Sequence, residues 1–363
     1  MIKLISEILK QNEFSKEDII RLLQSDEKEQ QLIFARANQV KKEFVGLKTY
    51  YRGLVEFSNF CNKNCYYCGI RAGNKEVERY DLSDEQILEA VHYAHKSNYA
   101  SVVFQSGERN DEAFISRIEN LLKKVKETTN NEIGITLSLG EQTLETYQKW
   151  FNGGAHRYLL RIETTNKELY YKIHPHNKKH NFESRIQALY DLKRVGYQTG
   201  TGVMIALPFQ TIEDLANDLL FFKNFDIDMV GMGPYIEHHD TPLYEFKDLL
   251  MPLKDRFYLS LRMISILRIM MKDINIAAAT ALQAIDPIGR EKAIKAGANI
   301  IMPNITPGFN RANYQLYENK PCIDEGAEDC TKCLEARIAL TGDTVAYGEW
   351  GDSTHFKNRT KNL

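Results

Sequence analysis

Short apolar runs alternate with amphipathic segments along most of the chain from residue 54 onward. Eight runs are rich in apolar or β-branched residues: 54–60, 101–107, 133–140, 157–164, 199–207, 228–236, 274–282 and 299–306. The segments between them carry apolar residues at helical spacing, and several begin with Ser, Thr or Asp and end with Gly, as capped helices do. Strands that alternate with helices form a parallel sheet, and eight such units can close into a barrel. We therefore predict an α/β fold, a (β/α)8 TIM barrel.

The two ends of the chain depart from this alternation. Residues 1–50 follow helical spacing, with a helix start signal at Ser15 and a long charged segment after it. After residue 306 the sequence becomes turn-rich and contains Tyr and Cys. We expect an N-terminal helical cap over 1–50, the barrel over 51–310 and a Cys-containing C-terminal extension over 311–363. The last dozen residues look disordered in sequence.

The overall charge of the chain is close to zero. Lys and Arg number 47 against 49 Asp and Glu, which gives a net charge of −2. A whole-molecule basic field, which would concentrate nucleic acid or anionic membrane, is therefore not expected. The sequence also lacks the uninterrupted apolar stretch of a signal peptide or a membrane span. We expect a cytoplasmic protein that contacts neither nucleic acid nor membrane.

The six cysteines fall into two triplets. Cys61, Cys65 and Cys68 form the first, and Cys322, Cys330 and Cys333 form the second. In a reducing cytoplasm, cysteines in such groups are more often metal ligands or catalytic groups than disulfides. The first triplet directly follows the first predicted strand, at the end of the barrel where barrel enzymes carry their chemistry.

Three thiolates in one short loop can hold either of two kinds of metal centre. Zinc needs a closed tetrahedral set, and residues 55–80 offer no His and no further Cys, although a distant His could supply the fourth ligand. A [4Fe–4S] cluster fits better, because three thiolates hold three irons and leave the fourth iron open to an exogenous ligand. A purely structural centre would normally be fully ligated, so the missing ligand favours chemistry.

The spacing Cys61-x3-Cys65-x2-Cys68, with the aromatic Tyr67 before the third cysteine, resembles the signature of the radical S-adenosylmethionine (SAM) superfamily. In that superfamily the open iron binds the amino and carboxylate groups of SAM, and reduction of the cluster cleaves SAM to methionine and a 5′-deoxyadenosyl radical. Other segments resemble the HydE family of [FeFe]-hydrogenase maturases: FQSGE (104–108), ITLSLGE (135–141), RYLLRIETTN (157–166) and IIMPNITP (300–307). This resemblance extends from about residue 40 to 335.

The resemblance assigns SAM contacts to particular residues. Gln105, Ser106, Gly107 and Glu108 take the place of the segment that meets the SAM amino group, and Tyr67 is the aromatic residue of the signature. Glu163 corresponds to the ribose-binding acid and Arg185 to the partner of the SAM carboxylate. These roles are chemically sensible, because a carboxylate accepts bonds from ribose hydroxyls and a guanidinium grips a carboxylate with two parallel bonds. A salt bridge at the barrel rim, for Glu163, and an exposed helix face, for Arg185, are the structural alternatives.

Polar residues that face the inside of a barrel are costly unless they are paired or functional. Thr136 and Ser138 alternate with apolar residues on the third strand, so both hydroxyls face one side. In the family that the chain resembles, the corresponding positions line a cavity for anionic, amino-acid-like groups: Thr136, Ser138, Arg157, Thr280, Met302 and Tyr314. A hydrogen-bonded barrel layer without a ligand is the alternative for each Ser or Thr.

The second triplet, Cys322-x7-Cys330-x2-Cys333, indicates a second iron–sulfur cluster of the [2Fe–2S] or [4Fe–4S] type. A peripheral zinc with a fourth ligand such as His355 is the alternative.

The resemblance implies a role in assembly of the diiron subcluster of [FeFe]-hydrogenase. The implied substrate is a cysteine-bound Fe(CO)2(CN) unit, and the implied partners are the maturase HydG and an electron donor. Methylornithine synthase and biotin-synthase-like enzymes are the nearest alternatives, although strands two to eight lack the cysteines that a sacrificial sulfur cluster needs. A non-catalytic scaffold stapled by metal is an alternative of a different class.

Overall fold

The computed structural model describes residues 3–322 and 334–361, and it confirms the predicted barrel. Each of the eight apolar runs contains or overlaps one barrel strand: β2 (Gly53–Ser58), β3 (Ser101–Ser106), β4 (Gly134–Ser138), β5 (Ala155–Leu159), β6 (Gln198–Thr201), β8 (Met229–Val230), β10 (Asn275–Ile276) and β11 (Ile300–Ile301). Seven of these strands form one parallel sheet in the order β10-β8-β6-β5-β4-β3-β2.

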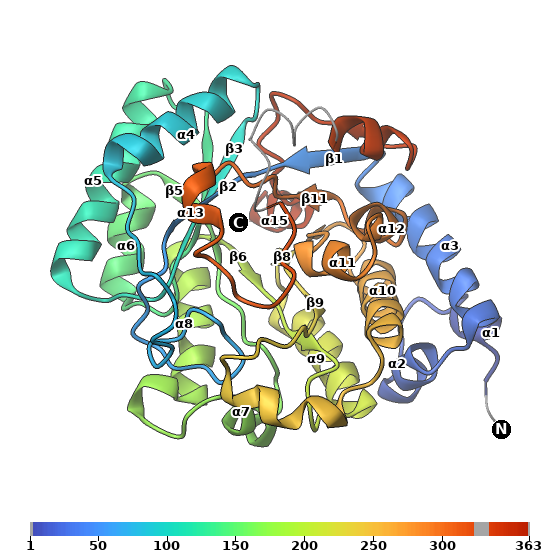
Figure 1. Cartoon of the computed structure of the whole chain (residues 1–363). Helices are drawn as coiled ribbons and strands as arrows, with labels where there is room; N and C mark the ends of the chain where they lie inside the picture. Colours follow the sequence, from blue (N-terminus) through green and yellow to red (C-terminus); the bar gives the residue numbers. More distant parts are fainter. Residues whose placement is uncertain (1–2, 323–333, 362–363) are drawn as a thin grey trace.

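The eighth strand, β11, lies between the two edges of this sheet. A parallel bridge joins Ile300 to Ala277 beyond β10, and another joins Asn304 to Leu54 of β2. The Leu54 amide donates to the Pro303 carbonyl at 2.8 Å, and the Ala278 amide donates to the Ile300 carbonyl at 2.9 Å. The curled sheet thereby closes on itself (Figure 1).

Helices surround the barrel on its outer side (Figure 1). The longer ones are α4 (Asp84–Lys96), α5 (Glu112–Thr128), α6 (Leu144–Asn152), α8 (Phe182–Val195), α9 (Ile212–Phe225) and α10 (Leu253–Met270). Shorter elements follow several strands: α7 (Lys167–Ile173), η1 (Lys178–His180), β7 (Met204–Ile205), β9 (Gly233–Pro234), η2 (Pro242–Leu249), α11 (Thr280–Ile285), α12 (Gly289–Lys295) and α13 (Gly308–Arg311). Ser83 and Thr211 start α4 and α9 with capping boxes, as their positions in the sequence predict.

Three helices precede the barrel: α1 (Ile5–Ile8), α2 (Lys16–Leu23) and α3 (Glu27–Phe44). Two strands were not predicted, β1 (Lys48–Tyr51) and β12 (Thr344–Val345); they pair with each other in parallel, and β1 also pairs with β11. Lys41 of α3 forms a fully buried ion pair with Asp343, with 2.5 Å between Nζ and Oδ2. The amino-terminal helices are therefore fixed to the carboxyl-terminal segment.

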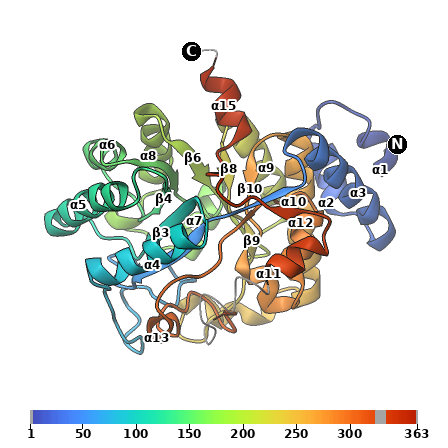
Figure 2. The same cartoon turned by 90° about the horizontal axis from the view of Figure 1, so that it is seen from above.

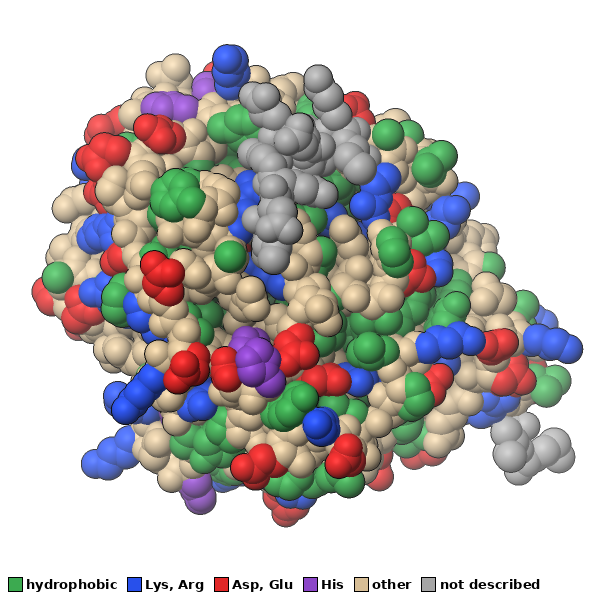
Figure 3. All heavy atoms as spheres, in the orientation of Figure 1, with side chains coloured by type: hydrophobic (Ala, Val, Ile, Leu, Met, Phe, Trp, Pro, Cys, Tyr) green, Lys and Arg blue, Asp and Glu red, His purple; other side chains and the backbone are tan. Residues whose placement is uncertain are grey.

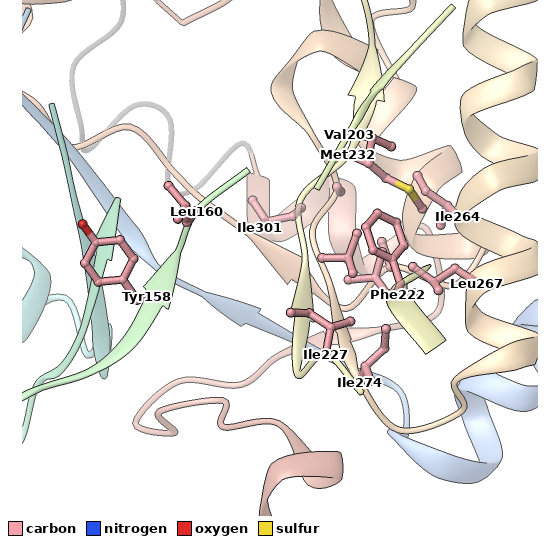
Figure 4. Packing of buried hydrophobic residues seen from close by; sticks show 14 of the residues in the cluster. Tyr158, Leu160, Val203, Phe222, Ile227, Met232, Ile264, Leu267, Ile274 and Ile301 are labelled. Carbon is pink, nitrogen blue, oxygen red and sulfur yellow. The ribbon is translucent and has the colours of Figure 1, made fainter. Parts of the chain in front are cut away.

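The main core lies between the barrel strands and the surrounding helices. Phe222 of α9 packs among Ile264 and Leu267 of α10 and Met232 from the barrel wall (Figure 4). All four side chains are fully buried. This packing fixes α9 and α10 against the sheet, so that the strand ends between them are held in place.

The carboxyl-terminal residues are ordered, so the predicted disorder of the last dozen residues was wrong for the part of them that is described. Gly351 accepts bonds from the side chains of Arg52 (3.1 Å) and Asn275 (2.9 Å), and the Ser353 amide donates to Gln198 (3.0 Å). These three partners stand at the starts of barrel strands. The segment therefore closes the amino end of the barrel, and α15 (Thr354–Thr360) lies on the opposite side of the molecule from α13 (Figure 2).

The face of the molecule seen in Figure 3 carries acidic and basic side chains intermixed, without a large area of one sign. Among the described residues, no helix is long and apolar enough to cross a membrane.

Candidate active site at the carboxyl ends of the strands

The cysteine loop, residues 59–74, leaves the carboxyl end of β2 and is held from several sides. The Tyr66 amide donates to the Ile173 carbonyl at 3.0 Å, and the Gly69 amide donates to the Leu316 carbonyl at 3.0 Å. The Asn64 amide donates to Nε2 of His180 at 2.9 Å, which requires a neutral ring; burial lowers the pKa of His180 to about 4. The loop is therefore fixed by segments that follow β5 and β11.

Cys61 lies where the loop meets the end of β3. Its sulfur accepts bonds from the backbone amides of Lys63 (3.4 Å) and Glu108 (3.3 Å). A Cβ at Gly107 would lie 2.3 Å from the Phe60 carbonyl oxygen and 2.7 Å from Cys61 Cβ. The FQSGE segment thus needs glycine at this position because the backbone passes directly against the cysteine.

The three cysteines are free thiols, and their number suits a cluster better than zinc, since a structural zinc needs four protein ligands. Burial raises the pKa of Cys65 to about 12 and raises the pKa of Cys61 and Cys68 as well, so thiolates here need a cationic partner such as iron. Since the loop is half-buried, supplies three sulfur donors and leaves one position open, its residues fit a [4Fe–4S] cluster.

Four charged side chains meet beside the loop. Lys63 Nζ lies 2.6 Å from Glu141 Oε2 and 3.1 Å from Glu108 Oε1. Arg185 pairs with Glu141 and lies 3.9 Å from Glu108, and its Nη1 donates to the Arg161 carbonyl at 2.9 Å. Burial raises the pKa of Glu108; burial opposes ionisation of Glu141 too, but Arg185 and Lys63 outweigh it and lower that pKa. Two cations thus share two carboxylates in a nearly dry site.

Glu163 stands just beyond β5 in a strained conformation. Its φ is +67°, which is unusual for a residue with a side chain. Burial raises the pKa of the carboxyl, and Oε2 has no aligned hydrogen-bond donor although Arg161 Nη2 is 2.9 Å away. A buried acceptor without a donor suits a ligand that brings hydroxyl groups.

Tyr67 occupies the aromatic position of the signature. Its hydroxyl donates to Nε2 of His174 at 3.2 Å, and the two rings meet edge to face with centroids 5.3 Å apart. His174 is neutral, because burial lowers its pKa, and it stacks on Tyr170. This aromatic group supports the back of the loop between Cys65 and Cys68.

The six residues predicted to line the interior of the barrel do not lie together in the structure. Thr136 and Met302 border a small interior cavity of about 20 Å3, together with Arg52 and Asn275. Ser138 is half-buried at the end of β4, and Thr280, half-buried at the start of α11, does not line this cavity. Tyr314 is buried after α13, with Lys320 Nζ 5.0 Å from its ring centroid.

Arg157 has structural partners on all sides. It is fully buried, its Nε donates to Thr136 (2.9 Å), its Nη1 pairs with Asp352 (2.6 Å) and its Nη2 donates to Ser101. Its guanidinium is therefore occupied by the segment that closes the amino end of the barrel. Arg161, four residues later, is about one third exposed beside Glu163, and its buried Nε has no partner.

Cys330 and Cys333 of the second triplet lie outside the described residues. Cys322, the described member of the triplet, is half-buried. His355, the alternative zinc ligand, has both ring nitrogens in use: Nδ1 is 2.9 Å from Asp273 and Nε2 is 2.6 Å from Asp226. In the structure these two contacts of His355 hold α15 against the barrel.

Several site residues were missed in the sequence: Lys63, Glu141, Arg161, His174 and His180. Lys63 and Glu141 stand inside quoted motifs, CNKNCYYC and ITLSLGE, but the charge pairing that joins them spans 78 residues. The charged residue within each motif was the one signal in the sequence that could have indicated these two site residues.

Comparisons with known proteins agree with this geometry. The profile of the radical SAM superfamily matches residues 55–222. The [FeFe] hydrogenase maturase subunit HydE of Thermotoga maritima is 42% identical over 349 residues, which cover 96% of each chain. Among solved structures, methylornithine synthase has a TM-score of 0.79 at 24% identity, covering 95% of this chain and 98% of its own. The maturase HydG of Carboxydothermus hydrogenoformans has a TM-score of 0.77 at 20% identity, covering 94% and 79%. The two structural matches show a shared fold.

Proposed function

The chain belongs to the HydE family of [FeFe]-hydrogenase maturases within the radical SAM superfamily, and from this membership we propose that it cleaves SAM reductively during assembly of the hydrogenase diiron subcluster. The observation that carries the proposal is the cysteine loop at the open end of the barrel, with three sulfurs for a [4Fe–4S] cluster and a buried charged site beside it. When bound, the cluster supplies the electron that cleaves SAM to methionine and an adenosyl radical.

The surrounding residues would bind and orient SAM. Arg185 would pair with its carboxylate, and Glu163, whose Oε2 lies near Arg161 but has no aligned hydrogen-bond donor, would accept bonds from the ribose hydroxyls. The segment Gln105, Ser106, Gly107 and Glu108 would face the amino group, and Tyr67 would border the cluster. Lys63 and Glu141 would keep the charges of Glu108 and Arg185 balanced before SAM arrives.

The substrate would be a cysteine-bound Fe(CO)2(CN) unit delivered by HydG, and it would enter at the same open end. Of the predicted lining residues, Thr136 and Met302 border the interior cavity, while Ser138, Thr280 and Tyr314 stand nearer the strand ends. We propose Arg161 in place of Arg157 as the arginine that meets an anionic substrate, because all three guanidinium nitrogens of the fully buried Arg157 already donate to protein groups, whereas Arg161 is about one third exposed.

Reductive SAM cleavage is tested with anaerobically reconstituted protein. It should show broad visible absorption and release 5′-deoxyadenosine when dithionite and SAM are added. The Cys65→Ala variant should lose both properties, and the Cys322→Ala variant should retain SAM cleavage. Release of 5′-deoxyadenosine by Cys65→Ala at the wild-type rate would refute the proposal.

The maturase role is tested separately in a host that makes [FeFe]-hydrogenase. Deletion of the gene should abolish hydrogenase activity, and plasmid-borne wild type should restore it. Active hydrogenase at the normal level after deletion would reject this assignment and leave radical SAM chemistry intact. We place the protein in the cytoplasm with HydG and a reductant as transient partners.

Cys322, Cys330 and Cys333 would hold a second iron–sulfur cluster. The Cys330→Ala variant should bind less iron than wild type while it retains the first cluster. Equal iron content in the two proteins would contradict a second cluster.

A further inference from the structure

Arg79 contacts both ends of the cysteine loop. Its guanidinium donates four hydrogen bonds to backbone carbonyls. The acceptors are Asn59 at 2.5 Å, Ile70 at 2.8 Å, Arg71 at 2.7 Å and Asn74 at 3.0 Å. The first acceptor is where the loop begins and the other three are where it ends. One side chain therefore ties together the two ends of the segment that carries all three cysteines.

The charge of Arg79 is held close to two of the cysteines, because its acceptors Asn59 and Ile70 stand two residues from Cys61 and Cys68, respectively. Unlike the neighbouring Arg109 and Arg117, which pair with Asp81, it has carbonyl oxygens as its hydrogen-bond partners. Burial lowers the pKa of Arg79, and the thiolates of Cys61 and Cys68 oppose that shift. The guanidinium thus provides a fixed positive charge near two of the three ligand sulfurs.

We infer that Arg79 is a positioning residue of the cysteine loop: it clamps the loop in the conformation that presents the three sulfurs, and its charge makes the bound cluster easier to reduce. The second part rests on the proposed function. A planar guanidinium can serve four carbonyls that surround it, whereas a lysine ammonium has three donors and lacks the fork geometry. The reduction potential of an iron–sulfur cluster depends on the net charge and hydrogen bonds around it.

The clamp is tested on the full chain without metal, by hydrogen exchange of the amides of Arg71, Ala72 and Asn74. These amides donate to loop carbonyls at 3.2, 2.7 and 3.0 Å. In Arg79→Lys we expect their exchange to be about tenfold faster than in wild type, which corresponds to the loss of about one net hydrogen bond. Exchange at the wild-type rate would overturn the clamp.

The electrostatic part is tested on protein loaded with iron and sulfide. Arg79→Lys keeps the charge, so its cluster should have a midpoint potential close to that of wild type. This variant should bind less iron per chain than wild type, because the clamp is weakened. Arg79→Met removes the charge, so its potential should be more negative than that of Arg79→Lys. Equal potentials in these two variants would overturn the electrostatic role.

Arg117→Lys is the matched control. Arg117, on α5, also donates several side-chain hydrogen bonds, but its acceptors lie after the cysteine loop in the chain: Asp81, Asp84 and the Leu82 carbonyl. Its variant should leave loop exchange and cluster potential unchanged, and a change as large as that of Arg79→Lys would overturn a specific role for Arg79. If the wild type binds no iron, the proposed function fails, yet exchange in the metal-free protein still decides the clamp. If Arg79→Met does not fold, Arg79→Gln replaces it as the variant without the charge. A midpoint potential and an iron content equal to those of wild type in Arg79→Gln would overturn the inference.

Discussion

Gly107 is constrained by the cysteine loop, which passes directly against its backbone. Its φ is not in the left-handed region, so the constraint is space: the Phe60 carbonyl and Cys61 Cβ occupy the volume that a methyl group would need. The motif glycine therefore permits contact between the end of β3 and the start of the cysteine loop.

Gly107→Ala should displace Cys61 and reduce the iron bound per chain, at a cost of about 1–3 kcal/mol in the free energy of unfolding. Iron analysis after anaerobic reconstitution and denaturant unfolding check both effects. Gly308→Ala is the control, because a Cβ there meets nothing within 4 Å. Full iron content in Gly107→Ala would contradict the close approach.

Glu163→Gln should weaken SAM binding to the cluster-loaded protein about tenfold or more, because hydrogen bonds to a charged acceptor contribute roughly 1.5–3 kcal/mol. Calorimetric titration with SAM measures this. Glu168→Gln, on the exposed side of α7, should bind SAM like wild type. Unchanged affinity in Glu163→Gln would remove the carboxylate from the ribose site.

Among elements, the segment between β5 and α7 carries Glu163 and depends on a buried acid in α9. Asp218 accepts bonds from the Thr165 amide (2.7 Å) and hydroxyl (2.6 Å), and its second oxygen has no partner. Burial raises the pKa of Asp218 to about 7. Its neutral form therefore suits the folded protein better than its charged form.

This acid should make the protein less stable as pH rises. The folded state binds one more proton than the unfolded state between the unfolded pKa of about 4 and the folded pKa of about 7, so the free energy of unfolding falls across that window. The slope approaches about 1.4 kcal/mol per pH unit. Denaturant unfolding from pH 5 to 8 should show a shallower fall in Asp218→Asn. Identical slopes in both proteins would contradict the shifted pKa.

The elements differ in how far the sequence predicts them. The eight barrel strands were predicted because each is a local apolar run between helices. The strands β1 and β12 were missed because each is short and gains its partner only at long range, as in the pairing of Lys48 with Thr344. The cysteine loop was likewise local, whereas the Lys63–Glu141 contact was not. Arg157 and Arg161 stand an even number of residues apart in the predicted strand 157–164, so alternation gives them the same face and cannot tell which end of the barrel each one meets. In the structure β5 ends at Leu159, before Arg161.

At the scale of the whole molecule, the segment around Gly351 and Asp352 closes the amino end of the barrel, opposite the cysteine loop. Asp352 forms an ion pair with the fully buried Arg157, with 2.6 Å between Oδ1 and Nη1. An ion pair of this kind adds little relative to an apolar contact, but removing one partner leaves a buried charge unpaired.

Asp352→Asn should therefore lower the free energy of unfolding by roughly 3 kcal/mol. Glu349 stands three residues before Asp352 and forms an exposed ion pair with Lys48. Glu349→Gln should lower the free energy of unfolding by less than about 1 kcal/mol. Denaturant unfolding at neutral pH compares the two variants with wild type. Equal small losses in both would show that the closure does not depend on this pair.

The closing segment also sets an order of events during synthesis. Gly351, Asp352 and Ser353 follow every barrel strand in the chain, so they leave the ribosome after the strands whose starts they cover. Until then Arg157 has Thr136 and Ser101 but lacks its carboxylate. The cysteine loop and its partners near β3 and on α7 are made much earlier, and its last partner described above, Leu316, also precedes the closing segment. The nascent protein thus completes its metal-binding end first, and its opposite end is sealed last.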